Sequence, residues 1–200
     1  MSQILAVSTP PVNGHTARRL QTRSRLLSAG TALFAEHGVR QVTTTQIARH
    51  AGVATGTFYL HFEDKHALFA ELVRDAVTKM GAALDLDRLD QSDQAKRARD
   101  LDQMMAVAEE RLDLIRAVFD KGETSNIAED IHAGLANGIQ RRYRSLFANR
   151  GITLDPAAAA EARASMLIRL VGWWSADPSP TRRRHVVDAL VQLDPLRVAT

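Results

Sequence analysis

Residues 43–65 read TTTQIARHAGVATGTFYLHFEDK, and this stretch decides the fold of the N-terminal part of the chain. Thr43 and Gln46 stand three residues apart, the spacing of a capping box, in which each side chain bonds to the backbone of the other residue. A helix is therefore expected to begin near Thr43. Gly52 is expected to end it, because glycine adopts the left-handed conformation that closes a helix at no steric cost. Thr55 offers a second N-cap, so the pattern predicts two short helices joined by a tight turn.

The faces of the second short helix can be assigned from the spacing of its aromatic residues. Phe58 and Phe62 lie four residues apart, so they share one face and are expected to pack inward. The other faces of the same helix then carry Thr57, Tyr59, Leu60 and His61. Small polar groups and a tyrosine on the outer face of a helix that follows a tight turn are typical of a helix that enters the major groove of DNA.

Lys65 carries a further indication of an anionic partner. Asp64 is suited to cap the next helix, which places Lys65 in the first turn of that helix. A cation at this position opposes the helix macrodipole at a cost of a few tenths to about 1 kcal/mol. A contact with a DNA phosphate would offset this cost. The alternative is a lysine side chain that is simply solvated.

The net charge of +3 is unevenly distributed along the chain. Residues 1–66 carry seven lysines and arginines against three acidic residues, whereas residues 67–200 carry nineteen against twenty. The positive field therefore lies with the predicted helix-turn-helix, where a polyanion would dock. A surplus of four charges is common on small domains, so its placement is more informative than its size. The basic run at residues 18–25 adjoins the same region.

Composition bounds the remaining possibilities. The chain has 200 residues and no cysteine, which leaves no disulfide framework and no thiolate metal site. Residues 1–16 lack the basic start and apolar core of a secretory signal, and no later run reaches transmembrane length, so a cytoplasmic location is expected. His132 and His185 have no partner at metal-ligand spacing, so no metal or other cofactor is predicted. No catalytic constellation of nucleophile and base is apparent, and an enzyme is not expected.

The rest of the chain is expected to be helical throughout. No segment alternates convincingly with a period of two, so the sequence predicts an all-α fold of about nine helices. Residues 1–15 are interpreted as a mobile arm, residues 16–80 as a DNA-binding domain with a connecting helix, and residues 81–200 as a second helical domain. Asp155 followed by Pro156 predicts the capped start of a helix that runs to about Ser175.

Together these residues resemble the TetR family of bacterial transcriptional regulators. The resemblance runs from about residue 18 to residue 72 and rests on several short motifs. They are LFAEHG at 33–38, QIA at 46–48, AGV at 51–53, GTFYLHF at 56–62 and KHALF at 65–69. The resemblance implies a dimer of all-α subunits, in which a three-helix N-terminal domain is joined by a fourth helix to a C-terminal ligand-binding and dimerisation domain.

The resemblance also implies roles for individual positions. The groove-facing positions of the family correspond to Thr55, Gly56, Thr57 and Tyr59. Its phosphate-contacting positions correspond to Thr43, Thr44, His61 and Lys65. Thr45 is also included in the predicted DNA-binding set, but it stands where many members carry a longer polar or basic residue, so a base contact from it is not expected.

The C-terminal half suggests a ligand pocket and a dimer interface. Residues that would line a pocket are Met104, Met105, Ile115, Phe119, Leu135, Ile139, Tyr143 and Trp173, although plain core packing is the alternative for each. The helix from Asp155 has two apolar stripes, one with Ala164, Leu167, Val171 and Trp174 and the other with Met166, Leu170 and Trp173. A helix with so wide an apolar surface must be covered on two sides. Residues expected at the dimer interface are Leu167, Leu170, Val171, Trp174, Val187, Leu190 and Val191, and which stripe faces the partner stays open.

The function expected from the sequence is that of a ligand-responsive transcriptional regulator. It would bind a palindromic double-stranded DNA operator as a homodimer, act most often as a repressor, and be released by a small, lipophilic organic effector. The alternatives are an activator, a helical DNA-binding or adaptor protein without an effector, and an enzyme that uses the C-terminal cavity.

Overall fold

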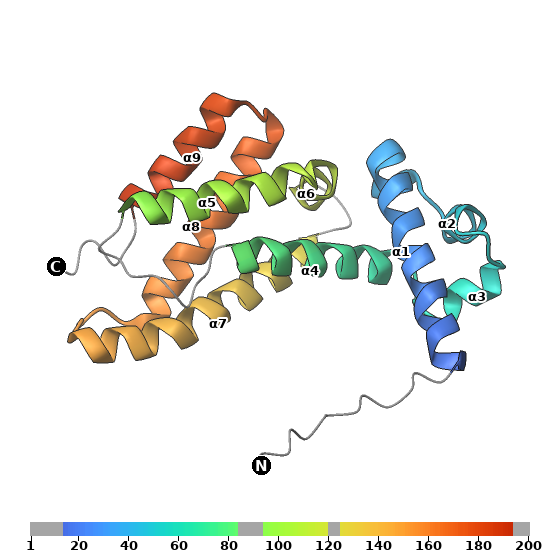
Figure 1. Ribbon diagram of the computed structural model, residues 1–200, viewed down its shortest axis with the longest axis horizontal. Helices are drawn as coiled ribbons and strands as arrows, with labels where there is room; N and C mark the ends of the chain where they lie inside the picture. The colour runs from blue at the N-terminus through green and yellow to red at the C-terminus, as the bar shows by residue number, and fades with distance from the viewer. Residues whose placement is uncertain (1–13, 84–93, 120–124, 194–200) are drawn as a thin grey trace, which may run out of the picture.

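The computed structural model describes residues 14–83, 94–119 and 125–193, and these contain nine α-helices and no strand. The predicted all-α fold is confirmed. In chain order the helices are α1 (Gly14–Gln41), α2 (Thr44–His50), α3 (Thr55–Tyr59), α4 (Lys65–Ala83), α5 (Gln94–Glu109), α6 (Leu112–Phe119), α7 (Ser125–Arg150), α8 (Pro156–Ala176) and α9 (Pro180–Gln192). Figure 1 shows α1, α2 and α3 grouped at one end of the molecule and α5 to α9 at the other, with α4 between them.

The N-terminal group has a core of its own. Leu26, Ile47 and Phe58 are fully buried in it, together with the side chains that α4 contributes. Gly30 permits a close approach between α1 and α4, because a side chain there would collide with Leu68. The helical backbone of α1 is interrupted at Gly38, where φ is 75°. This is the residue at which the sequence predicts the end of the first helix.

Helix α4 connects the two parts of the molecule. Leu68, Phe69 and Val73 near its start belong to the N-terminal core, whereas Met80 near its end packs against the C-terminal core. Helix α6 also lies between the two cores, because Leu114 packs on the N-terminal one and Ile115 belongs to the C-terminal one. A displacement of either helix therefore affects both cores.

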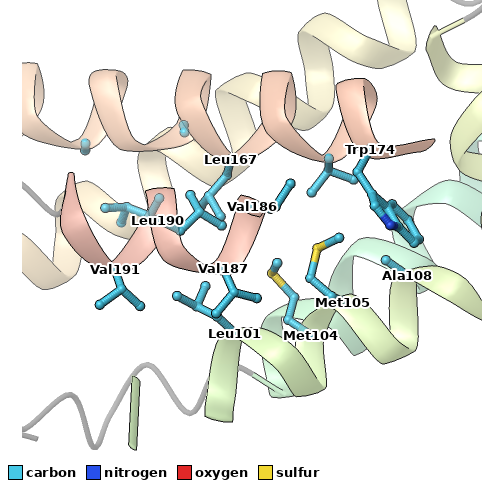
Figure 2. Close-up of a cluster of buried hydrophobic side chains, with 14 of the residues drawn as sticks. Leu101, Met104, Met105, Ala108, Leu167, Trp174, Val186, Val187, Leu190 and Val191 are labelled. Atoms are coloured by element: carbon cyan, nitrogen blue, oxygen red, sulfur yellow. The ribbon is translucent and has the colours of Figure 1, made fainter. Parts of the chain in front are cut away.

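The C-terminal group consists of α5 to α9 around a second core. The helical pattern expected over residues 101–121 is divided into α5 and α6, as the sequence left open. Asp155 caps α8 as predicted, since its carboxylate accepts hydrogen bonds from the backbone N–H groups of Ala157 and Ala158 at 3.2 Å. Figure 2 shows side chains from α5, α8 and α9 interdigitating in this core. Trp174 is among the most deeply buried of them, at 1% exposure.

Some expectations fall outside the described residues. The predicted arm at residues 1–15 lies outside them apart from its last two residues, which begin α1. Residues 85–93, whose polar sequence without a clear period indicates a linker, also lie outside them. The domain boundary, which the sequence places between Met80 and Asp100, therefore stays a prediction.

Candidate DNA-binding surface

The start of α2 is fixed by the predicted capping box. The Thr43 hydroxyl accepts from the backbone N–H of Gln46 at 3.2 Å, and Gln46 Oε1 accepts from the backbone N–H of Thr43 at 2.8 Å. The next residue, Thr44, lies with its hydroxyl 3.1 Å from the phenol oxygen of Tyr59. This contact joins the first turn of α2 to the last turn of α3. It gives the exposed Tyr59 side chain a fixed direction.

The start of α3 differs from the expectation. The N-cap is Ala54, which has no side-chain hydrogen bond, and Thr55 is already the first helical residue. The interpretation of Thr55 as an N-cap is therefore wrong. The extended backbone ends at Ala54, one residue earlier than predicted from the preference of threonine for N-cap positions. The Thr55 hydroxyl is consequently not engaged in capping, and Gly52, with φ of 65°, supplies the turn between α2 and α3 as predicted.

The predicted orientation of α3 is confirmed. Phe58 is fully buried and Phe62 is 5% exposed, with their ring centroids 5.8 Å apart. Tyr59, the next residue after Phe58, is 56% exposed. The aromatic pair anchors the helix to α1 and α2, and the opposite face of α3 is turned to solvent.

Leu60 was expected on an outer face of the helix but was not included in the predicted DNA-binding set. It occupies the C-cap position of α3 and is 72% exposed, the largest value among the bulky apolar side chains of the described residues. The signal was present in the spacing, because Leu60 stands four residues after Gly56 and so continues the outward face of α3. An exposed leucine beside an exposed tyrosine gives this face an apolar as well as a polar component.

Lys65 has a hydrogen-bond partner within the protein, and that partner carries no negative charge. Its ammonium group donates to the backbone carbonyl of Arg40 at 3.1 Å, which ties the start of α4 to the end of α1. Asp64 caps α4 as predicted, accepting from the backbone N–H of Ala67 at 2.8 Å. An ammonium group has three donors, so the bond to Arg40 leaves donors of Lys65 available to an external anion.

The basic run of α1 divides into structural and exposed members. Arg23 is paired with Glu71 of α4, and its guanidinium lies 4.8 Å from the centroid of the Phe62 ring. Arg25 donates to the carbonyl of Gly52 at 3.1 Å and thereby braces the turn between α2 and α3. Arg18 and Arg19 are exposed near the start of α1. In this run Arg18, Arg19 and Arg25 are therefore exposed cations, whereas Arg23 is paired with Glu71.

His61 follows α3 and is influenced by these cations. Burial lowers the pKa of His61, and the positive charges of Arg19 and Arg23 lower it further. Its Nδ1 atom is buried without a hydrogen-bond partner in the described part of the chain. An anion bound beside this histidine would be attracted by the neighbouring cations. The other predicted polar positions are Thr43 at the N-cap of α2, Thr44 and Thr45 on α2 and Thr57 on α3, and all four are at least partly exposed.

An apolar cavity of about 100 Å³ lies between α4, α5, α6, α7 and α8. Four residues of the predicted pocket line it, namely Met104, Ile115, Phe119 and Leu135. The other four do not. Met105, Ile139 and Tyr143 are buried in the C-terminal core away from the cavity, and Trp173 is 44% exposed on the surface. Periodicity identified the inward faces of these helices, but it could not say which inward side chains border a void.

The residues predicted for the dimer interface lie mostly inside the subunit. Buried members of that set are Leu167, Val171, Trp174, Val187, Leu190 and Val191. Figure 2 shows side chains of α5 beside those of α9 and beside Trp174. Leu167 and Val171 line the apolar cavity within the subunit. A side chain buried in its own subunit leaves no surface for a partner. Of the two stripes on α8, the second remains accessible. Met166 and Leu170 are partly exposed, and the Trp173 ring is open to solvent with the Arg182 guanidinium 4.5 Å from its centroid.

No helix in the described part of the chain combines the length and apolar character needed to cross a bilayer. Within the same residues, no group of three histidine and acidic side chains is placed to hold a metal ion.

Comparison with known proteins agrees with the arrangement of the N-terminal helices. Residues 26–72 match the family model described as bacterial regulatory proteins, tetR family. The chain is similar to the HTH-type transcriptional repressor BepR of Brucella suis biovar 1, with 44% identity over 57 residues. This match covers 28% of the chain and 27% of BepR, so the chain spans about a quarter of that relative's length.

Solved structures extend the likeness to the whole fold. RolR in complex with resorcinol superposes with a TM-score of 0.61 and 25% identity, covering 89% of each chain. NalD of Pseudomonas aeruginosa, the secondary repressor of the MexAB-OprM multidrug efflux pump, superposes with a TM-score of 0.63 and 22% identity. That comparison covers 87% of this chain and 96% of NalD. The C-terminal helices thus share a fold with these regulators although their sequences have diverged.

Proposed function

We propose that the chain is a ligand-responsive transcriptional repressor of the TetR family, because residues 26–72 match the family model of these bacterial regulatory proteins. It binds a palindromic DNA operator as a homodimer and is released by a small organic effector. The observation that carries this proposal is the contrast between neighbouring side chains at α3. Phe58 is fully buried, whereas Tyr59 and Leu60 face outward.

DNA recognition is assigned to two sets of side chains. In the major groove, Thr55, Gly56, Thr57 and Tyr59 approach base edges, and Leu60 adds an apolar contact suited to a thymine methyl group. On the backbone, Thr43, Thr44, Thr45, His61 and Lys65 contact phosphates, with Arg18 and Arg19 of α1 beside them. Phosphate contacts fix the register of the domain on DNA, while base contacts supply sequence preference.

A dimer is proposed because one short helix reads few bases. Two copies related by two-fold symmetry read two half-sites, and the operator is then a palindrome. The exposed stripe of α8, with Met166, Leu170 and Trp173, is the face that we assign to the partner subunit. An exposed tryptophan stacked beneath an arginine is the kind of side chain that anchors protein interfaces.

The effector is proposed to act through α4. This helix carries Lys65 at the DNA-facing end and Val73, Val77 and Met80 along the apolar cavity. A ligand that fits the cavity better in one position of α4 than in the other shifts the molecule toward that position. If that position puts the two α3 helices out of step with the half-sites, affinity for DNA falls. In this proposal residues 16–80 form the DNA-binding domain with its connecting helix, and residues 81–200 form the effector-binding and dimerisation domain.

The proposal is tested by fluorescence anisotropy with full-length protein and a labelled duplex from the region upstream of its own gene. A scrambled duplex of the same composition is the control. Stronger binding to the genuine sequence, weakened by an apolar ligand, is the expected result. Equal affinity for both duplexes would exclude a sequence-specific regulator, and specific binding without any ligand response would leave a regulator that lacks an effector.

A further inference from the structure

The lining of the cavity restricts the chemistry of its ligand. The cavity is bordered by α4, α5, α6, α7 and α8, and every lining side chain from the described residues is apolar. His132 follows the lining residue Ile131, and Ser165 lies three residues before the lining residue Ile168. The two side chains hydrogen-bond to each other at 2.9 Å, and neither lines the cavity. Within the described part of the chain, almost no polar atom reaches the cavity surface. A hydroxyl, amine or carboxylate placed there would therefore lose its hydrogen bonds to water without replacement.

The size of the cavity restricts the ligand further. Its volume is about 100 Å³. Pockets for drug-sized ligands are larger, typically about 300–1,000 Å³, whereas an apolar cavity of about 150 Å³ is sufficient to bind benzene. A single aromatic ring, with at most slight widening of the site, matches this space. A long acyl chain or a fused-ring compound does not.

The cavity also has a defined boundary toward the surface. Phe119, the last residue of α6, lines both the cavity and a wide cleft between α1, α6 and α8. The ring rests directly on the backbone of α8, since a Cβ at position 172 would lie 2.9 Å from Phe119 Cε1, and Gly172 leaves that space free. The ring therefore stands where a ligand from the cleft would enter.

From these observations we infer that the cavity takes a compact, uncharged hydrocarbon with no hydrogen-bonding group, admitted past the Phe119 ring. The class is that of a single-ring aromatic hydrocarbon. This differs from the chemistry of resorcinol, the ligand in the RolR structure, whose two hydroxyl groups would find no partner here. The regulatory meaning of this site rests on the proposed function, whereas binding to it does not.

The test of ligand class uses toluene, phenol and benzoate, which share one ring and differ in polarity. Each is titrated by calorimetry into the full-length protein without DNA. Toluene is expected to bind at one site per subunit, phenol about tenfold to a hundredfold more weakly, and benzoate not at all. Failure of toluene to bind at its solubility limit, or equal affinity for phenol, would overturn the inference.

Variants locate the site within the cavity. Ala128→Leu fills the cavity from α7 and is expected to abolish toluene binding, whereas Ala133→Leu, on the exposed side of the same helix, leaves it unchanged. Val118→Thr places a hydroxyl in the lining at nearly constant volume and is expected to raise the affinity for phenol relative to toluene. Toluene binding that survives Ala128→Leu would place the ligand elsewhere and contradict the assignment.

The role of Phe119 is tested by the rates of binding, followed by stopped-flow measurement with toluene. Phe119→Ala is expected to raise the association and dissociation rates together, and Phe119→Trp to lower both, with smaller changes in Kd. If Phe119→Ala fails to fold, as judged by circular dichroism, the tryptophan variant decides. Rates that do not respond to ring size would overturn the assignment of Phe119 to the entrance.

Binding and regulation are separated by repeating the anisotropy measurement with toluene present. Toluene that binds without releasing DNA supports the inference and removes the cavity from the proposed function. DNA release by a polar effector, with no toluene binding, would retain the proposed function and overturn the inference.

Discussion

Adjacent side chains of α3 lie in opposite environments. Phe58 is buried between α3 and the rest of the N-terminal core, while Tyr59 and Leu60 are open to solvent. The Tyr59 hydroxyl lies 3.1 Å from that of Thr44, a contact that orients the Tyr59 ring. Near this face, Lys65 and Arg25 donate to backbone carbonyls, which position the two cations without neutralising them. The exposed acids Glu63 and Asp64 precede Lys65 in the chain.

Replacing Lys65 with alanine is expected to weaken binding to every duplex by a similar factor. A phosphate contact releases one counterion, so the slope of log K against log salt should flatten by about 1 per half-site. Lys79→Ala, on an exposed turn of α4 where the lysine pairs with Asp75, is the control. A slope that does not change in the Lys65 variant would show that its ammonium group contacts no phosphate.

His61 makes stability depend on pH. Its pKa is lowered in the folded state by burial and by Arg19 and Arg23, so the unfolded chain takes up a proton more readily. The free energy of unfolding should therefore fall as pH drops through the ordinary histidine pKa of about 6.5, and stop falling below the folded-state pKa. Thermal melts between about pH 5 and pH 8 measure this.

The comparison for that prediction is between two histidine variants. His61→Gln should remove part of the acid-side loss of stability, whereas His185→Gln, on an exposed turn of α9, should not. If the melting temperature falls equally with pH in the wild type and in His61→Gln, then His61 does not contribute to the pH dependence of stability.

At the scale of secondary-structure elements, α2 and α3 are too short to be stable alone. Isolated helices below about 12–15 residues are marginal in water. Helices α2 and α3 are held in place by the capping box at Thr43, by the glycine turn at Gly52, and by the aromatic contacts of Phe58 and Phe62 with the N-terminal core. The stability of the proposed DNA-binding surface thus depends on side chains other than those proposed to contact DNA.

Phe58→Ala is accordingly expected to destabilise the N-terminal domain by about 3–5 kcal/mol, because it leaves a large cavity in a closed core. Leu60→Ala, two residues away but exposed, should change stability by less than about 0.5 kcal/mol. Urea unfolding followed by circular dichroism measures both. A Phe58 variant that keeps its stability while changing its DNA preference would show that α3 is turned the other way.

The sequence was most informative where local chemistry determines local structure. The capping box, the turn at Gly52, the inward pair Phe58 and Phe62 and the cap at Asp155 were all predicted correctly. The cap of α3 was not, because threonine preference gave no signal that the backbone would turn at Ala54 instead. The cavity lining was predicted only in part, since apolar periodicity marks inward faces but does not distinguish packed side chains from those that border a void.

At the scale of the whole molecule, two cores share α4 and α6, and α3, the helix proposed to read DNA, lies at the far end from α8 and α9 (Figure 1). Leu167 and Leu190, which the sequence placed at a dimer interface, are buried within the subunit, and the sequence could not show which helices pack against them. The stripe with Trp173 is the face proposed for the partner. The proposal thus assigns folding and assembly to two adjoining stripes of α8.

The two neighbouring tryptophans separate assembly from folding. Trp173→Ala should weaken the proposed dimer by about 2 kcal/mol or more while leaving the subunit folded. Trp174→Ala should instead destabilise the subunit by about 3–5 kcal/mol, since that side chain is 1% exposed. Sedimentation velocity and thermal melting distinguish the two effects. A Trp173 variant that dimerises as strongly as the wild type would place the interface elsewhere.

Selection of binding sequences from a random duplex library by the full-length protein tests the central claim most directly. The expected product is a palindromic consensus with two half-sites about one or more helical turns apart. Repeating the selection with Leu60→Ala should remove preference for a thymine at one position of each half-site while retaining the rest of the consensus. Recovery of duplexes with no common sequence would contradict the assignment of α3 as a helix that reads DNA.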